Sequence, residues 1–204
     1  EVGQRLLPEP LIAAGVQLAL VLSGASQSAL RSVLLEQLVA GELVGGVAWQ
    51  EQLGQLQLHQ GLSTTALEQG DSLRLNGVKK FVTPASGATG WVVSAQLAEQ
   101  PILVWVPADL AGLTHVDQRA VDGSILCTLS LENVLLPKSH LLLQGPEVLK
   151  VVDQANDAAR IIQAAELLGG MRRALALTLE YLQTRKQFGK LIGSFQALKH
   201  RVVD

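Results

Sequence analysis

The spacing of hydrophobic residues along the chain changes period twice. Residues 1–45 carry apolar side chains at helical spacing, as in SALRSVLLEQLVAGE, where Leu30, Leu34 and Leu38 recur at intervals of four. Gly41 follows this run, and glycine is the residue that most often ends a helix. We therefore expect residues 1–45 to form a helical segment.

From residue 46 to about residue 145, apolar and polar positions alternate instead. DSLRLNGVKKFV predicts two short strands that meet at Asn76-Gly77, a dipeptide typical of tight hairpins. ILCTLSLENVLLP alternates Cys127 and Leu129 with polar Thr128, which predicts a half-buried antiparallel strand. Residues 46–145 are therefore expected to form an antiparallel, barrel-like β domain.

The helical period returns at about residue 146, in VLKVVDQANDAARIIQAAELLGGMRRALALTLEYLQTR. A short break over residues 186–193 follows, and Ser194 is placed to cap a last helix from Phe195 onward. Residues 146–204 thus predict the start of an antiparallel helical bundle. The expected class is α+β, with three domains in the order helical, β and helical.

Composition narrows the classes of function. The 204 residues are 48% hydrophobic and the formal net charge is −2, so no broad basic face is available to bind nucleic acid. The single cysteine, Cys127, excludes an internal disulfide and suits a reducing, cytoplasmic setting. The four histidines have no metal-ligand spacing, so no metal site is expected; they are His59, His115, His140 and His200.

An uncharged stretch raises the question of a membrane span. Its strongly apolar part, Leu11 to Leu22, is shorter than the roughly twenty residues that a bilayer crossing needs. We expect a buried helix there and no membrane span.

The segment RKQFGKLIGSFQ gathers chemistry suited to a ligand. Arg185 offers a rigid fork of donors for phosphate, Phe188 offers a flat face, and Gln196 offers an amide beside a helix start. Together these groups suit a large ligand with phosphate and aromatic parts, such as a dinucleotide. The alternative is that Arg185 and Lys186 form a solvated helix end and that Phe188 belongs to the core.

YLQTRKQFGKLIGSFQALKHRVVD resembles the signature of the flavin-dependent acyl-CoA dehydrogenase family, R-x-Q-F-G-x-x-I-x-x-F-Q. GDSLRLNGVKKFVT is similar to that family's G-x-x-x-x-L-N-G-x-K-x-F/W-I-T segment, and LSLENVLLP to its F-x-x-V-x-V-P strand end. EVGQRLLPEP resembles part of the first helical domain. The resemblance covers essentially the whole chain but only the middle of a family member, so we expect both ends of such a member to be missing.

The resemblance implies FAD as cofactor. Phe81 would pack against the flavin ring and Thr83 would hydrogen-bond it, although ordinary strand alternation also explains both residues. A second group falls where the family contacts FAD held by a neighbouring subunit, which implies a homo- or hetero-oligomer. Its members are Arg185, Lys186, Gln187, Phe188, Phe195 and Gln196.

The resemblance also places the substrate. Asp157 and Arg160 in NDAAR fall where the family binds acyl-CoA, although a solvated helix face would look the same. Family members use a glutamate base, and one family position for it falls on Ala159, which cannot accept a proton. The commoner position lies beyond Asp204, so no catalytic acid is nominated in this chain.

One family segment is altered. Where the pattern is A-x-T-E-P-x-x-G-S-D, this chain has AWQEQLGQLQL, with Gln50 for threonine, Glu51 retained, Gln52 for proline and no Ser-Asp pair. Backbone contacts of Gln50 and Glu51 to flavin are expected to survive such changes. The missing serine predicts weak or absent flavin in the isolated chain.

The implied reaction is FAD-dependent oxidation of an acyl-CoA to the 2,3-enoyl-CoA, with an electron-transfer flavoprotein or a similar protein as acceptor. The alternative is a non-catalytic subunit of a heteromeric member, which completes the FAD site of its partner. A third possibility is an acyl-CoA oxidase or flavin monooxygenase on the same fold.

Overall fold

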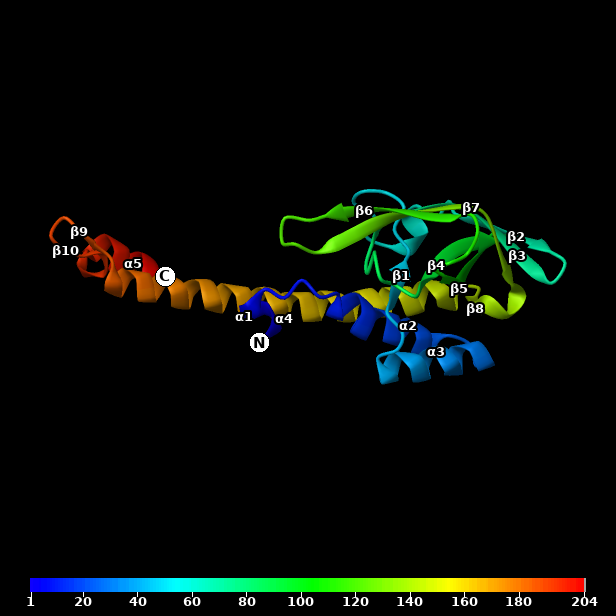
Figure 1. The fold of residues 1–204 in the computed structure, drawn as a ribbon, viewed down its shortest axis with the longest axis horizontal. Helices are drawn as coiled ribbons and strands as arrows, with labels where there is room; N and C mark the ends of the chain where they lie inside the picture. The colour runs from blue at the N-terminus through cyan, green and yellow to red at the C-terminus, as the bar shows by residue number, and fades with distance from the viewer. Residues whose placement is uncertain (204) are drawn as a thin grey trace. The chain divides into compact units, whose positions relative to one another are not determined.

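The computed structural model describes residues 1–203 (Figure 1). The chain divides into two compact units, of which the larger is Pro8–Ile161 and the smaller combines Glu1–Leu7 with Ile162–Asp204. Helix α4 (Glu147–Thr184) contributes residues to both units. The three-domain boundaries expected from sequence remain a prediction.

The larger unit begins with helices. A π-helix, η1 (Leu11–Gln17), leads directly into α2 (Leu18–Gly24). Leu18 and Leu22 are fully buried, whereas Leu11 and Leu20 are 50% and 42% exposed, so the uncharged run buries one side only and not the whole helix that was expected to be buried. Within residues 1–203, no helix combines the length and the apolar character that a membrane crossing requires.

Helix α3 (Ala29–Ala40) has the ends that the sequence predicts. Ser28 Oγ accepts a hydrogen bond from the Arg31 backbone N–H at 3.1 Å, which caps the first turn. Gly41 ends the helix with φ 75°, a conformation that costs glycine little.

The sheet has eight strands in the order β6-β7-β3-β2-β4-β5-β8, with β1 also paired to β4. The strands are β1 (Gly45–Ala48), β2 (Thr65–Gln69), β3 (Ser72–Val82), β4 (Gly90–Leu97), β5 (Gln100–Pro107), β6 (Leu113–Arg119), β7 (Ile125–Pro137) and β8 (Leu141–Gln144). The α+β class is confirmed, but the sheet is mixed rather than purely antiparallel. Both β1 and β2 run parallel to β4 and share one of its edges, because long connections, not tight turns, bring them there.

Two hydrophobic clusters lie on the two faces of β4 and β5. Trp91 and Val93 belong to the cluster shared with β3 and β7, whereas Val92 belongs to the one formed with α2, α3 and the start of α4. Burial on both faces explains why WVVSA and ILVWV are continuous apolar runs.

The hairpin predicted at Asn76-Gly77 is wrong. β3 passes straight through this dipeptide, with a register shift against β7 between Leu75 and Gly77. The Asn76 side-chain oxygen instead accepts a hydrogen bond from the Asn133 backbone N–H on β7 at 2.8 Å. A Cβ on Gly77 would lie 2.5 Å from Thr64 Oγ1, so glycine here permits close packing rather than a turn.

The smaller unit contains α1 (Val2–Arg5), β9 (Lys186–Gln187), β10 (Lys190–Leu191), a 3₁₀ turn η4 (Ile192–Ser194), α5 (Gln196–Val203) and the later part of α4. α1 packs closely on α4, because a Cβ on Gly3 would lie 1.9 Å from the Glu166 carbonyl oxygen. The predicted break is a two-residue hairpin whose central residues, Phe188 and Gly189, have φ 53° and 78°.

The cap predicted for the last helix differs from the structure. Ser194 Oγ donates a hydrogen bond to the Leu191 carbonyl at 2.7 Å. The first turn of α5 is instead closed by the Phe195 carbonyl, which accepts from the backbone N–H groups of Leu198 and Lys199. The serine therefore stabilises the preceding 3₁₀ turn.

Candidate functional site

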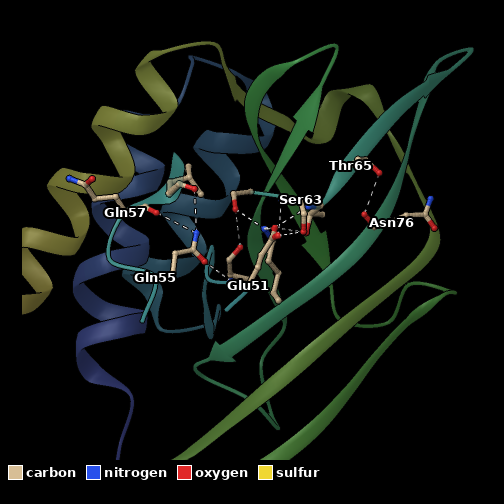
Figure 2. A network of polar contacts seen from close by, with 11 residues as sticks. Glu51, Gln55, Gln57, Ser63, Thr65 and Asn76 are labelled. Atoms are coloured by element: carbon tan, nitrogen blue, oxygen red, sulfur yellow. Dashed lines mark hydrogen bonds and ion pairs between the residues drawn. The ribbon is translucent and has the colours of Figure 1, made fainter. Parts of the chain in front are cut away.

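Glu51 is the hub of a buried polar cluster in the larger unit (Figure 2). Its Oε1 lies 2.5 Å from Lys79 Nζ and accepts from the Thr64 N–H at 3.0 Å and the Thr64 hydroxyl at 2.7 Å. Its Oε2 accepts from the Ser63 N–H at 2.6 Å and from the Ser63 hydroxyl. One carboxylate therefore holds both ends of the loop from residue 51 to residue 64.

Burial and charge act against each other in this cluster. The side chains of Lys79 and Glu51 are only 0% and 6% exposed. Burial alone would raise the pKa of Glu51, but the Lys79 charge and the hydrogen bonds from Lys79, Ser63 and Thr64 lower it to about 2. Burial lowers the pKa of Lys79 to about 8, against the opposing influence of Glu51. Both groups are thus mainly charged at neutral pH, and Ser94 Oγ provides a further contact to Lys79 Nζ at 2.9 Å.

Two backbone groups of the altered loop form hydrogen bonds within the chain. The Gln50 carbonyl accepts from the Lys80 N–H at 2.8 Å, and the Glu51 N–H donates to Gln55 Oε1 at 2.7 Å. Gln55 is itself buried, with 2% of its surface exposed. These two backbone groups are therefore hydrogen-bonded within the chain, and the backbone contacts of Gln50 and Glu51 to flavin stay a prediction.

Phe81 and Thr83 are better suited to a planar ligand. Phe81 lies at a second register shift of β3 against β7, has φ 57° and is 37% exposed, so its ring is not part of the core. Thr83 Oγ1 has a long 3.5 Å contact to the Ile125 carbonyl, which a better-placed acceptor can replace. A ring face and a hydroxyl are both available at this end of β3.

The β9–β10 hairpin of the smaller unit is exposed. Arg185, Lys186 and Gln187 are exposed, and Phe188 is 90% exposed, so Phe188 is not a core residue in this chain. The Phe195 ring meets Phe188 edge-on at 6.1 Å between centroids, and Lys190 Nζ lies 4.5 Å from the Phe195 centroid. Gln196, also exposed, is the first residue of α5. This surface offers a guanidinium, an amide and a flat ring, a set that fits the phosphate and aromatic parts of FAD.

The residues assigned to acyl-CoA lie on α4 in the larger unit. Arg160 Nη1 is 2.6 Å from Asp157 Oδ1, and Arg160 Nη2 donates to the Leu56 carbonyl at 3.1 Å. Both charged side chains are exposed, and Ala159 between them is half-buried. The methyl group of Ala159 offers no proton acceptor.

The family motif points only to the backbone of Glu51, whereas the structure shows a cluster of contacts to its carboxylate. A sequence signal for this cluster lies in β3. Lys79 falls on the same alternating positions as Leu73 and Leu75, which are buried. A lysine in a buried phase requires an acidic partner. That the partner is Glu51, 28 residues away, could not be predicted from the sequence.

Comparisons with known proteins agree with this architecture. A family model described as "Acyl-CoA dehydrogenase, C-terminal domain" matches residues 149–204. The Bacillus subtilis protein named "Probable acyl-CoA dehydrogenase YngJ" is 34% identical over 153 residues, which cover 71% of this chain and 40% of that protein.

Two solved structures have the same fold. The ChsE4-ChsE5 complex from Mycobacterium tuberculosis matches 100% of this chain and 53% of its own, with TM-score 0.83 and 24% identity. A Mycobacterium smegmatis glutaryl-CoA dehydrogenase in complex with FADH2 matches 92% of this chain and 50% of its own, with TM-score 0.80 and 26% identity. The chain thus spans less than half of the curated relative and about half of each solved chain. By sequence and by fold, this chain belongs to the acyl-CoA dehydrogenase family.

Proposed function

We propose that this chain acts in the FAD-dependent α,β-dehydrogenation of an acyl-CoA thioester to the 2,3-enoyl-CoA. The observation that carries the proposal is the exposed hairpin with Arg185 and Phe188, followed by Gln196 at the start of α5. The FADH2 bound to the glutaryl-CoA dehydrogenase supports flavin as the cofactor. When bound, FAD supplies the hydride acceptor.

The chain's own residues would bind and orient the two ligands. Arg185 would hold a phosphate through charge-assisted hydrogen bonds, while Phe81 would cover a flavin face and Thr83 would hydrogen-bond the ring. Lys186, Gln187, Phe188, Phe195 and Gln196 would complete the contact with a flavin held by a neighbouring subunit. Asp157 and Arg160 would contact the acyl-CoA.

Removal of the proton next to the thioester carbonyl needs a positioned carboxylate. Ala159 cannot provide one, so in this proposal the base comes from a carboxylate outside these 204 residues. The electrons would then pass to an electron-transfer flavoprotein or a similar acceptor.

A second candidate function is that of a non-catalytic subunit in a heteromeric enzyme. The specific observation in its favour is that the Gln50 carbonyl and the Glu51 N–H are bonded inside the chain, whereas the Arg185 hairpin is exposed. Such a chain would complete its partner's FAD site without holding a flavin ring of its own. The ChsE4-ChsE5 complex supports a heteromeric arrangement for this fold.

Flavin content separates the two functions. The measurement is FAD bound per complex after this chain is mixed with a catalytic family partner, for wild type, Arg185→Ala, Arg185→Lys and Phe81→Ala. Arg185→Ala should weaken FAD binding by about ten- to a hundredfold, since a charge-assisted hydrogen bond contributes about 1.5–3 kcal/mol. Arg185→Lys should recover part of the loss, because an ammonium lacks the planar fork.

Phe81→Ala then tests whether this chain holds a flavin ring itself or only contacts the flavin of its partner. Lower flavin content in this variant indicates that the chain holds a ring itself, and unchanged content favours the non-catalytic subunit. The exposed Arg173 on α4 provides the matched control, Arg173→Ala, which should behave as wild type. Equal flavin in wild type and Arg185→Ala would refute both functions.

A further inference from the structure

Three potential metal ligands meet where β6 pairs with β7. Asp117 lies directly opposite Cys127 in this antiparallel pair. His115 is two residues from Asp117 on β6, so both side chains point to the same face of the strand. One ligand atom from each of the three residues lies within 4.8 Å of the others.

Neighbouring groups orient two of these ligands. The Ser86 hydroxyl donates to one carboxylate oxygen of Asp117. His115 Nδ1 lies 2.8 Å from the other, a contact between two of the ligands themselves that the ion would replace. The Trp91 ring packs beside the His115 imidazole, with 6.1 Å between centroids. Zinc sites use hydrogen bonds and packing of this kind to fix their ligands.

We propose that His115, Asp117 and Cys127 bind a zinc-class divalent cation, with a fourth position open to water. An imidazole nitrogen, a carboxylate oxygen and a thiolate sulfur are the three ligand types that Zn²⁺ takes in proteins, and three protein ligands leave one position free. The thiolate excludes Mg²⁺ and Ca²⁺, which prefer oxygen ligands. None of the three ligands is among the residues assigned to FAD and acyl-CoA, but Cys127 pairs with Val82, which lies between Phe81 and Thr83 on the neighbouring strand.

Exposure indicates how the ion enters. The side chains of His115 and Asp117 are 38% and 32% exposed, whereas Cys127 is fully buried. The ion would therefore meet the imidazole and carboxylate first and the sulfur last. Contraction of the three ligand atoms around the ion would bring them to the usual Zn–N, Zn–O and Zn–S distances of about 2.0–2.3 Å.

The charge and proton balance suits this ligand set. Asp117 offers a partly exposed carboxylate, and Cys127 is a fully buried thiol in the metal-free chain. Binding breaks the S–H bond, releases one proton to the solvent and forms an S–metal bond. The dication with one thiolate and one carboxylate has no net charge.

The spacing of the four histidines along the chain predicts no metal site. The site would instead draw its ligands from two strands, and their strand pairing, not their spacing along the chain, brings them together. The competing interpretation is a surface His115–Asp117 hydrogen bond above an inert core cysteine.

Cobalt titration of the 204-residue, tag-free chain distinguishes the two. Because Cys127 is the sole cysteine, a thiolate-to-cobalt charge-transfer band can arise from this residue alone. We expect the band to appear with one equivalent of Co²⁺, to disappear when Zn²⁺ is added, and to be accompanied by release of one proton. Below the pKa of the thiol, the apparent affinity should rise about tenfold per pH unit.

The variants test each ligand. His115→Asn and Asp117→Asn change partly exposed side chains and should abolish the band without unfolding the chain, and Cys127→Ser should abolish it as well. Ser86→Ala should weaken Co²⁺ binding by about 10–100-fold, the usual effect of losing a group that orients a ligand. His59→Asn, at an exposed histidine elsewhere, is the control and should bind Co²⁺ as wild type does. Absence of the band in wild type, or its persistence in both His115→Asn and Asp117→Asn, would overturn the proposal.

Discussion

Lys79 Nζ lies 2.5 Å from Glu51 Oε1, and the two residues are 28 positions apart in the sequence. Lys79 is fixed on β3, and Glu51 begins the loop that returns to Ser63 and Thr64. The ion pair therefore ties a loop of irregular backbone to the centre of the sheet.

Removing one member of this pair should destabilise the chain strongly. Glu51→Gln leaves a buried ammonium without its counterion, and Lys79→Met leaves a buried carboxylate, so each should lower the free energy of unfolding by about 3–5 kcal/mol. The double variant should lose less than the sum of the two, because no unpaired charge remains. Urea unfolding followed by circular dichroism measures all three.

The exposed Lys138–Glu68 pair is the matched control. Its side chains are 40% and 58% exposed, so Glu68→Gln should change the free energy of unfolding by less than about 1 kcal/mol. Additive losses at Glu51 and Lys79 would show that the pair is not energetically coupled.

Low pH should decrease the free energy of unfolding through protonation of Glu51. Its pKa falls from 4.5 to about 2 on folding, so the unfolded state binds the proton first as the pH decreases. This contribution to stability is complete above about pH 4.5 and is lost as the pH falls towards 2, with a slope of at most about 1.4 kcal/mol per pH unit for one group. The difference in stability between wild type and Glu51→Gln should shrink over this range, and a constant difference would contradict the assignment.

Gly77→Ala should be destabilising even though alanine suits most strands better. The new Cβ would lie 2.5 Å from Thr64 Oγ1 and 2.8 Å from Thr64 Cα, so backbone must shift, at a cost of about 1–3 kcal/mol. That shift would also disturb the two hydrogen bonds from Thr64 to Glu51. Gly15→Ala is the control, since nothing lies within 4 Å of its Cβ position. Equal stability of the two variants would be incompatible with close packing at Gly77.

The 204-residue chain alone should not reduce an artificial electron acceptor when given acyl-CoA substrates, even with added FAD. Ala159 provides no base, and no other carboxylate of the chain is assigned to the reaction. A complete acyl-CoA dehydrogenase assayed in parallel serves as the positive control. Turnover above the FAD-only background would show that an acid in this chain had been overlooked.

The elements predicted correctly are those with local causes. Ser28 and Gly41 bound α3 through contacts within a few residues, and the alternation at Cys127 and Leu129 reports a strand with one buried face. Asn76-Gly77 failed as a hairpin signal because both residues serve partners distant in sequence. Asn76 bonds the β7 backbone at Asn133, and Gly77 makes room for another segment.

The candidate sites follow the same division. Arg185 and Phe188 could be nominated from one contiguous motif, and the structure shows that they are exposed. The partners of Glu51 and the meeting of Asp117 with Cys127 depend on strand register, which no local pattern specifies.

The carboxylate of Glu51 acts as a non-covalent cross-link. A disulfide that closed the same loop would restrict the unfolded chain, but it would need an oxidising environment and two cysteines in a loop that has none. Four hydrogen bonds close this loop without a disulfide, and the ion pair ties it to β3, so the closure does not depend on the redox environment. Protonation of the Glu51 carboxylate would weaken these contacts, and deprotonation would restore them. The closure of this loop therefore depends on pH and not on oxidation of the single buried thiol, Cys127.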